Sequence, residues 1–158
     1  MQKLYFTKER PTKSPERGTY VSAGLDFFVP DDFNGGEKYR LDTGKMVKVP
    51  TGIRVRIPEG YGLVFLDKSG VGVKGVKVMA GVIDEDYQGE IILCMAKVAT
   101  PEDDEYDHPY YIEPGKKLAQ GLLIPLLYAE VEEVEDSDIL YSDHISARGE
   151  GGFGSTGA

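Results

Sequence analysis

Residues 53–66 contain Ile53-Arg54-Val55-Arg56-Ile57, in which apolar and charged side chains alternate, then Pro58-Glu59-Gly60 and the apolar run Tyr61–Leu66. The alternation has the period of a half-buried β-strand. Proline and glycine close together are a turn signal. This stretch therefore predicts two β-strands in succession with a turn between them.

Three more β-rich runs lie further along the chain, at residues 71–78, 90–98 and 118–128. The first alternates valine with lysine and glycine, and its glycines suggest bulges or the close approach of a ligand. No segment has a sustained helical period, although Ser69 or Ser137 could start a single helical turn. Short strands with glycine and proline between them predict an all-β sandwich or barrel.

The composition of the 158-residue chain, 41 % hydrophobic and 28 % charged, is typical of one soluble globular domain. The single cysteine cannot form an intrachain disulfide, and we find neither a secretory leader nor an apolar stretch long enough to span a membrane. We therefore expect a cytoplasmic, intracellular protein with no membrane partner.

The net charge of −9 comes from two segments. Residues 101–107 hold five acidic residues and residues 129–138 hold six, and without these eleven the remaining sixteen acidic residues face all eighteen basic ones. A local phosphate site is compatible with this distribution. No basic stripe exists, so we expect no nucleic-acid partner.

The C-terminal stretch 148–158 holds five glycines, one arginine and one phenylalanine. Glycines let backbone N–H groups converge on an anion, Arg148 offers a planar fork for phosphate, and Ser155 and Thr156 add hydroxyl donors. Phe153 could stack on a base. The alternative is a glycine-rich terminus without a binding role.

The segment 80–90 runs from apolar residues into the acidic tip Asp84-Glu85-Asp86, then Tyr87 and Gly89. This order suits a hairpin that lines a pocket, where a carboxylate could orient and deprotonate water. Three acidic residues in so short a span could also bind a metal or form a solvated turn.

Three weaker patterns complete the set. Asp67-Lys68-Ser69-Gly70 could form a small phosphate cradle, and Pro114–Gln120 is a turn that leads into a strand with Gln120 as a potential donor. Ser22–Asp26 places an acid, Asp26, at a turn. Each of the three could also be an ordinary turn with polar surface residues.

Taken in order, these segments resemble the five motifs of the trimeric dUTPase family. Motifs one, two and four correspond to Ala23–Asp26, Lys68–Gly70 and Gly115–Gln120. The third motif is closely matched by residues 81–90, and the fifth almost letter for letter by residues 148–157. The resemblance extends from about residue 20 to the end of the chain.

The resemblance implies a distorted jelly-roll β-barrel in a homotrimer that exchanges its C-terminal strand and tail between subunits. Residues 1–147 would form the catalytic domain and residues 148–158 a flexible lid. The implied reaction is hydrolysis of dUTP to dUMP and pyrophosphate by attack of water on the α-phosphorus, which keeps uracil out of DNA and supplies dUMP for dTMP synthesis.

The resemblance also implies a role for each residue of the site. Asp84 would activate the water, Tyr87 would lie under the deoxyribose and exclude a 2′-hydroxyl, and the backbone of Gly81, Val82 and Ile83 would read the uracil edge. The remaining implied ligands of the substrate contact the phosphate chain or close over the base: Lys68, Ser69, Gly70, Gln120, Arg148, Phe153, Gly154, Ser155 and Thr156. Mg²⁺ would be bound mainly by the triphosphate and water, with Asp26 tied to it indirectly.

Some positions depart from the family pattern. Lys68 stands where an arginine is expected, which keeps the charge but loses the bidentate fork. The phosphate contact could therefore be weaker, or it could shift to Lys74 or Lys117. The glycines in residues 71–75 argue against the short helix expected there. The acidic loop 101–107 makes the connection before the fourth motif longer than usual.

The sequence leaves two alternative functions open: a dCTP deaminase-like enzyme of the same fold, or a nucleotide-gated regulator that binds a protein partner.

Overall fold

The computed structural model describes residues 2–101, 108–143, 146, 149 and 151. The chain divides into a first unit, residues 1–127, and a second unit, residues 128–158. The boundary predicted between residues 147 and 148 falls inside the second unit and stays a prediction.

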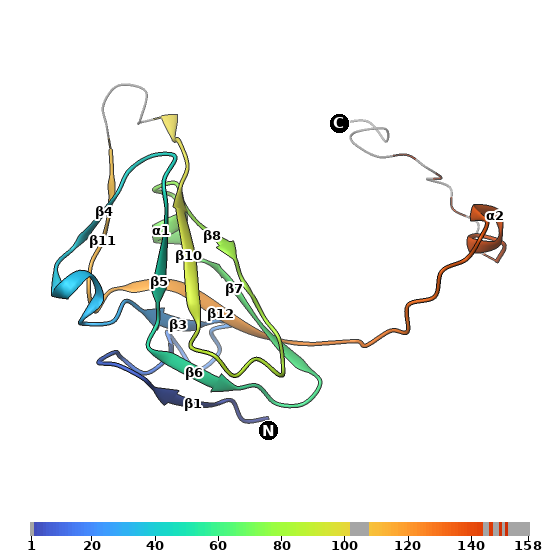
Figure 1. The fold of residues 1–158 in the computed structure, drawn as a ribbon, viewed down its shortest axis with the longest axis horizontal. Coiled ribbons are helices and arrows are strands. Elements are labelled where there is room, and N and C mark those ends of the chain that lie inside the picture. The colour runs from blue at the N-terminus through green and yellow to red at the C-terminus, as the bar shows by residue number, and fades with distance from the viewer. Residues whose placement is uncertain (1, 102–107, 144–145, 147–148, 150, 152–158) are drawn as a thin grey trace. The chain divides into compact units, whose positions relative to one another are not determined.

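The regular secondary structure among the described residues of the first unit is almost entirely β-strand (Figure 1). The strands are β1 (Tyr5–Lys8), β2 (Glu16–Arg17), β3 (Leu25–Phe28), β4 (Tyr39–Leu41), β5 (Met46–Pro50), β6 (Ile53–Arg56), β7 (Tyr61–Asp67), β8 (Val76–Ala80), β9 (Val82–Ile83), β10 (Ile92–Lys97), β11 (Tyr110–Ile112) and β12 (Lys117–Pro125). A 3₁₀ segment η1 (Phe33–Gly36) and a one-turn helix α1 (Ser69–Gly72) interrupt them, and the second unit contains the short helix α2 (Ser137–Leu140). The predicted all-β class is confirmed.

The strands form four antiparallel sheets. The largest has the order β2-β3-β12-β7-β9, a second has the order β5-β10-β8, and β1-β6 and β11-β4 are two-stranded. In Figure 1, β5 and β10 run side by side across the front of this unit, and the N-terminal β1 lies along β6 at its edge.

The core lies between these sheets and follows the alternation seen in the sequence. Ile53 and Val55 of β6 are buried, while Arg54 and Arg56 between and after them are exposed. Phe27 of β3 packs edge-on against Phe65 of β7, with ring centroids 4.7 Å apart. Inward-facing apolar side chains therefore join the sheets, as the period-2 pattern predicts.

Residues 71–78 do not form the single strand that their alternation predicts. Val71 and Gly72 belong to α1, where the N–H of Gly72 donates to the carbonyl of Lys68 at 2.7 Å, and the strand begins only at Val76. Gly75 has φ +74°, a left-handed conformation that ends the helical turn. Both one-turn helices begin at serines that could start a helical turn, Ser69 and Ser137, and the argument from the glycines of residues 71–75 against a short helix there was wrong.

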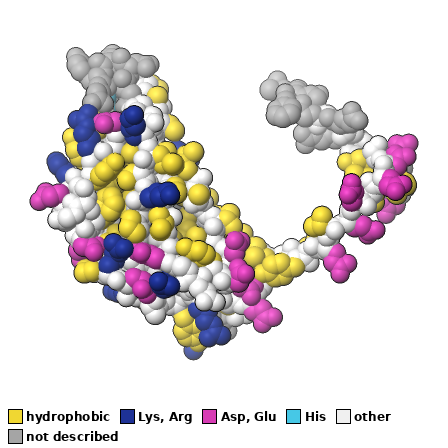
Figure 2. Space-filling model, viewed as in Figure 1, with side chains coloured by type: hydrophobic (Ala, Val, Ile, Leu, Met, Phe, Trp, Pro, Cys, Tyr) yellow, Lys and Arg dark blue, Asp and Glu magenta, His cyan; other side chains and the backbone are white. Residues whose placement is uncertain are grey.

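Exposed apolar side chains occur on the outer face of the β5-β10-β8 sheet. Met46, Met79 and Ile92 have exposed fractions of 58 %, 59 % and 44 %. The face in view in Figure 2 carries hydrophobic side chains between lysine, arginine and acidic ones. Among the residues that the structure describes, neither helix approaches the length and apolar character that a membrane crossing needs.

Truncation of Leu93 tests the packing of the core. This side chain of β10 is 1 % exposed, so Leu93→Ala should lower the free energy of unfolding by about 2–5 kcal/mol through lost burial and a residual cavity. Lys48, an exposed residue of the neighbouring β5, is the control, and Lys48→Ala should stay within about 0.5 kcal/mol of wild type. Denaturant titration measures both; equal small effects would contradict this description of the core.

Candidate active site

The third motif lies in the connection between β8 and β10, which form the antiparallel pair of the predicted hairpin with Ala80 opposite Cys94, but its own short strand β9 joins another sheet. β9 pairs with β7, with Ile83 opposite Leu63 and Val82 opposite Val64, whereas β8 and β10 pair with each other in another sheet. The segment that follows β9 therefore connects two sheets. Its acidic tip lies at the edge of the larger one.

Gly81 allows the chain to cross from β8 to β9. Its carbonyl accepts the N–H of Phe65 at 2.6 Å, and a Cβ on residue 81 would lie 2.5 Å from the carbonyl oxygen of Phe65. Any other residue would push the two backbones apart. The glycine thus holds Val82 and Ile83 close against β7.

Asp84 opens a tight turn, in which the N–H of Tyr87 donates to the Asp84 carbonyl at 3.2 Å. Asp84 is exposed, and its carboxylate has no hydrogen-bond or ion-pair partner within the described parts of the chain. By contrast, Glu85 next to it accepts the N–H of Gly60 at 2.8 Å. The turn therefore presents the carboxylates of Asp84 and Asp86 to solvent, while Glu85 between them is anchored.

Tyr87 is held by the same turn. Its hydroxyl donates to the carbonyl of Glu90 at 3.0 Å, and its ring lies so close to Gly89 that a Cβ there would overlap it. The side chain is 42 % exposed. One end of the ring is thus fixed to the backbone and one face remains open to a ligand.

The carboxylate of Asp26 in β3 forms ion pairs with two lysines. Its side chain is 8 % exposed, and its two carboxylate oxygens accept hydrogen bonds from Lys68 at 2.5 Å and from Lys117 at 2.8 Å. Burial alone would raise the pKa of Asp26, but the hydrogen bonds from Lys117 and Lys68 lower it below its ordinary value. The hydrogen bond to Asp26 in turn raises the pKa of Lys117. Lys117, one of the two lysines to which the sequence allowed the phosphate contact to shift, thus belongs to the same cluster as Lys68.

Gln120 of β12 lies beside this cluster. Its side-chain amide donates to the carbonyl of Asp67 at 2.9 Å, and the close approach of Gln120 leaves no room for a side chain at Gly24. Ser69 and Gly70 follow Lys68 in α1 and are exposed. Residues of the first, second and fourth motifs are therefore brought together.

These residues and the third motif lie toward opposite ends of β7. Ile83 is opposite Leu63, near the start of the strand, whereas Lys68 follows its last residue, Asp67. At the usual rise per residue of a β-strand, the backbone advances by about 17 Å over the five steps from Leu63 to Lys68. Asp84 and Lys68 of one chain are therefore not adjacent. The predicted residues Arg148, Phe153, Gly154, Ser155 and Thr156 lie outside the described residues.

The Asp26 cluster has a pH-dependent contribution to stability. Because the pKa of Asp26 is lowered, its contribution is complete above the ordinary carboxyl range of about 4 and lost as the pH falls through the lowered value. Because the pKa of Lys117 is raised, its contribution persists up to the ordinary lysine range of about 10.4 and is lost as the pH rises through the raised value.

We therefore expect Asp26→Asn to lower the free energy of unfolding by about 1–3 kcal/mol near neutrality, and by less below pH 4. Asp42→Asn is the control, because Asp42 is 46 % exposed and forms an ion pair with Arg40 at 2.6 Å. That substitution should cost about 0–1 kcal/mol. Denaturant titration across pH measures both, and a pH-independent cost at Asp26 would contradict the assignment.

Comparison with known proteins gives one consistent result. The dUTPase family model matches residues 10–157. The deoxyuridine 5'-triphosphate nucleotidohydrolase of Chlamydia muridarum is 34 % identical over 158 residues, which cover 98 % of this chain and 98 % of that protein. A mutant dUTPase of Staphylococcus bacteriophage 80alpha with dUpNHpp has 25 % identity and a TM-score of 0.79, with both chains covered completely. A mutant dUTPase of S. aureus phage phi11, whose structure coordinates a structural Mg(II) ion, shares the fold at 24 % identity, with a TM-score of 0.70 over 87 % of this chain and 99 % of that chain. The chain belongs to the dUTPase family.

Proposed function

We propose that this protein hydrolyses dUTP to dUMP and pyrophosphate, with water attacking the α-phosphorus. The observation that carries the proposal is the exposed Asp84 carboxylate, which no described side chain neutralises, at the tip of an anchored turn. Asp84 takes the proton of the attacking water, the new P–O bond forms, and the bond from the α-phosphorus to the bridging oxygen breaks. The electron pair leaves with pyrophosphate. The relatives of this chain carry the name of an enzyme that hydrolyses dUTP, which does not favour either alternative, a dCTP deaminase-like enzyme or a nucleotide-gated regulator.

The edge position of β9 supports recognition of uracil by the backbone. β9 is the last strand of its sheet and pairs only with β7 among the strands described. Successive residues of a strand direct their N–H and C=O groups to opposite edges, so one of Val82 and Ile83 turns its backbone groups outward. Those groups can pair with the polar edge of a pyrimidine, while the Tyr87 ring lies under the deoxyribose and leaves no room for a 2′-hydroxyl.

The phosphate chain is assigned to the groups around Asp26. Lys68, the Ser69 hydroxyl, the Gly70 N–H and the amide of Gln120 are the donors, and Arg148, Ser155 and Thr156 of the tail complete them, with Phe153 and Gly154 closing over the base. Positioned donors of this kind stabilise the negative charge that builds up as the bond to pyrophosphate breaks.

Mg²⁺ would bind at this site together with the substrate. Both oxygens of Asp26 accept hydrogen bonds from lysines, and the described residues contain no cluster of three or more carboxylates, histidines or cysteines suited to a metal. The triphosphate oxygens and water therefore supply the ligands, and Asp26 acts only through the lysines that it orients. Mg²⁺ neutralises charge on the phosphates when bound.

The separation of Asp84 from Lys68 supports an assembly in which one site uses more than one chain. The backbone span of about 17 Å between the level of Ile83 and Lys68 keeps Asp84 and Lys68 of one chain from contacting the same triphosphate, whereas a symmetric trimer can bring Asp84 of one subunit to Lys68 of another. The exposed apolar residues Met46, Met79 and Ile92 provide surface for such contacts.

Replacement of Asp84 tests the chemistry. Asp84→Asn should lower the rate of pyrophosphate release from dUTP by about 10²–10⁴-fold, the usual contribution of a general base. The affinity for the non-hydrolysable analogue dUpNHpp should change little. Asp86→Asn, an exposed acid two residues further along the same turn, is the control and should keep most activity. A fully active Asp84→Asn variant would remove the assigned role.

Mixed assemblies test the sharing of sites. Chains carrying Asp84→Asn and chains carrying Lys68→Met should each be at least about ten-fold less active alone. Refolded together in equal amounts, they should regain about a quarter of the wild-type rate, because a quarter of the two-chain sites receive both native residues. Asp84→Asn chains mixed with chains carrying both substitutions form the control, which stays inactive. No recovery in the first mixture would mean that each site lies within one chain.

A further inference from the structure

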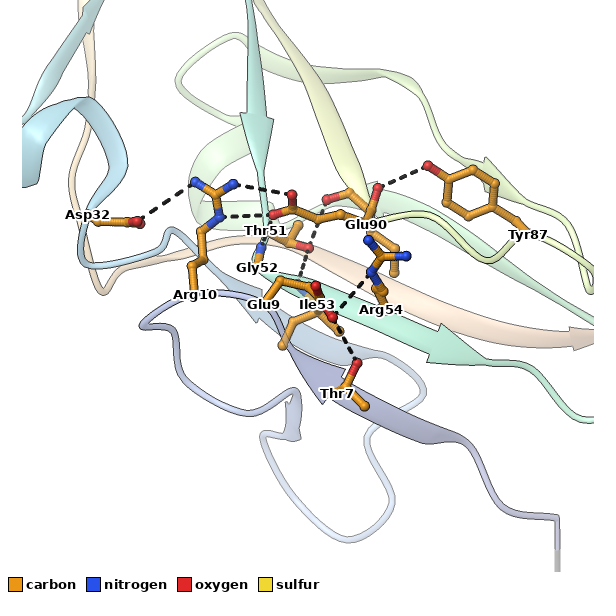
Figure 3. A network of polar contacts seen from close by, with 11 residues as sticks. Thr7, Glu9, Arg10, Asp32, Thr51, Gly52, Ile53, Arg54, Tyr87 and Glu90 are labelled. Carbon is orange, nitrogen blue, oxygen red and sulfur yellow. Dashed lines mark hydrogen bonds and ion pairs between the residues drawn. The ribbon is translucent and has the colours of Figure 1, made fainter.

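The turn that carries Asp84 and Tyr87 is attached to the rest of the unit by residues outside the five motifs (Figure 3). We define the third-motif turn as residues 84–90. Arg10 and Gly52 bind Glu90 at its end, Arg54 donates to the Gln88 carbonyl at 2.9 Å, and Gly60 donates to Glu85. The turn is therefore fixed at three points along its length.

The strongest of these attachments joins Arg10 to Glu90. The Nε and Nη2 atoms of Arg10 donate to the two carboxylate oxygens of Glu90 at 3.1 and 3.2 Å. The Glu90 side chain is 19 % exposed and that of Arg10 is 32 % exposed, so the pair is partly shielded from water. A two-point contact of this geometry fixes the orientation of the two side chains as well as the distance between them. Asp32 also faces Arg10, at 3.8 Å.

Gly52 shapes the site in which this pair forms. Its N–H donates to Glu90 at 2.7 Å, its carbonyl accepts the N–H of Glu9 at 2.8 Å, and its φ of +72° is left-handed. A Cβ at residue 52 would lie 2.5 Å from the Cγ of Arg10. Only glycine lets the Arg10 stem pass over the backbone to reach Glu90.

Glu90 connects this attachment to the residue that faces the sugar. Its side chain is held by Arg10 and Gly52, and its backbone carbonyl accepts the hydroxyl of Tyr87 at 3.0 Å. Figure 3 draws Tyr87 and the Arg10 guanidinium on either side of Glu90. A shift of the Glu90 backbone, which the side-chain contacts oppose, would therefore move the carbonyl to which the Tyr87 hydroxyl is bonded.

We propose that Arg10 and Glu90 are positioning residues that set the Tyr87 ring and thereby the discrimination between dUTP and UTP. This inference rests on the proposed function. Neither residue needs to touch the nucleotide, because the contact between them fixes the carbonyl to which the Tyr87 hydroxyl is bonded. A sugar carrying a 2′-hydroxyl is excluded only while the ring stays in place.

The first test measures the ratio of kcat/KM for dUTP to kcat/KM for UTP. Arg10→Met should lower this ratio by about ten-fold, mainly by admitting UTP. Arg10→Lys, which keeps the charge without the two-point fork, should fall between Arg10→Met and wild type. Glu90→Gln should resemble Arg10→Met, and the double variant should be no worse than either single one, because both remove the same contact. An unchanged ratio in folded Arg10→Met would overturn the inference.

The matched control is Arg40→Met. Arg40 forms an ion pair with Asp42 and belongs to β4, outside the residues that carry the proposal. Its removal changes the net charge by the same amount as Arg10→Met, and the dUTP to UTP ratio should stay at the wild-type value. A fall equal to that of Arg10→Met would assign the effect to charge alone and would also overturn the inference.

The second test does not depend on activity. In the nucleotide-free protein, amide hydrogen exchange of residues 85–90 should be about ten-fold faster in Arg10→Met than in wild type, with β10 unchanged. If wild type releases no pyrophosphate from dUTP, the proposed function fails, whereas faster exchange in this segment still supports the anchoring role of Arg10. If Arg10→Met changes neither the amide exchange of residues 85–90 nor the dUTP to UTP ratio, the positioning role of Arg10 and Glu90 is rejected. Normal dUTP turnover by wild type in that case leaves the proposed function intact.

Discussion

β12 lies between β3 and β7 and pairs antiparallel with both, and the candidate phosphate site depends on this double pairing. Gln120 is opposite Asp26 on one side and Leu66 on the other, so residues nearly a hundred positions apart in the sequence meet within one sheet. The buried carboxylate of Asp26 then orients Lys68 and Lys117. A change in the register of β12 would turn each of its side chains to the opposite face and separate these groups.

The lysines at Asp26, to which the proposed function assigns the phosphate chain, belong to an acidic chain. Lys68 and Lys117 face the Asp26 carboxylate, and Lys117 also faces Glu16 at 3.3 Å, so the charges of these four groups balance although the net charge of the chain is −9. The acidic segments at residues 101–107 and 129–138 lie elsewhere in the sequence. Local charge, and not the total, therefore determines which ligand this region attracts.

Local patterns in the sequence predicted much of the fold, because they depend on neighbouring residues. The alternation in Ile53–Ile57 and the turn signal after it correspond to β6 and β7, and the two predicted helical turns begin at Ser69 and Ser137. The strand predicted for residues 71–78 was wrong in its first half, since the helical hydrogen bonds of α1 and the left-handed Gly75 prevail over a valine alternation.

Long-range contacts could not be predicted in this way. The contact of Arg10 with Glu90 joins residues eighty positions apart, and nothing in either local sequence specifies the other. The same holds for the ion pair of Lys117 with Asp26 and for the pairing of β9 with β7. For Asp84 and Tyr87, the expected roles come from the family resemblance, whereas the structure adds the hydrogen bonds and neighbouring residues that hold their turn in place.

β9 ends the five-stranded sheet, and it is only two residues long. An exposed sheet edge offers unpaired backbone groups to any extended chain, and a long one is a template for aggregation. The shortness of β9, with Gly81 before it and an acidic turn after it, leaves little length of edge on which another strand could pair. The edge that the proposed function assigns to the uracil base is thus a poor template for polymerisation through the sheets.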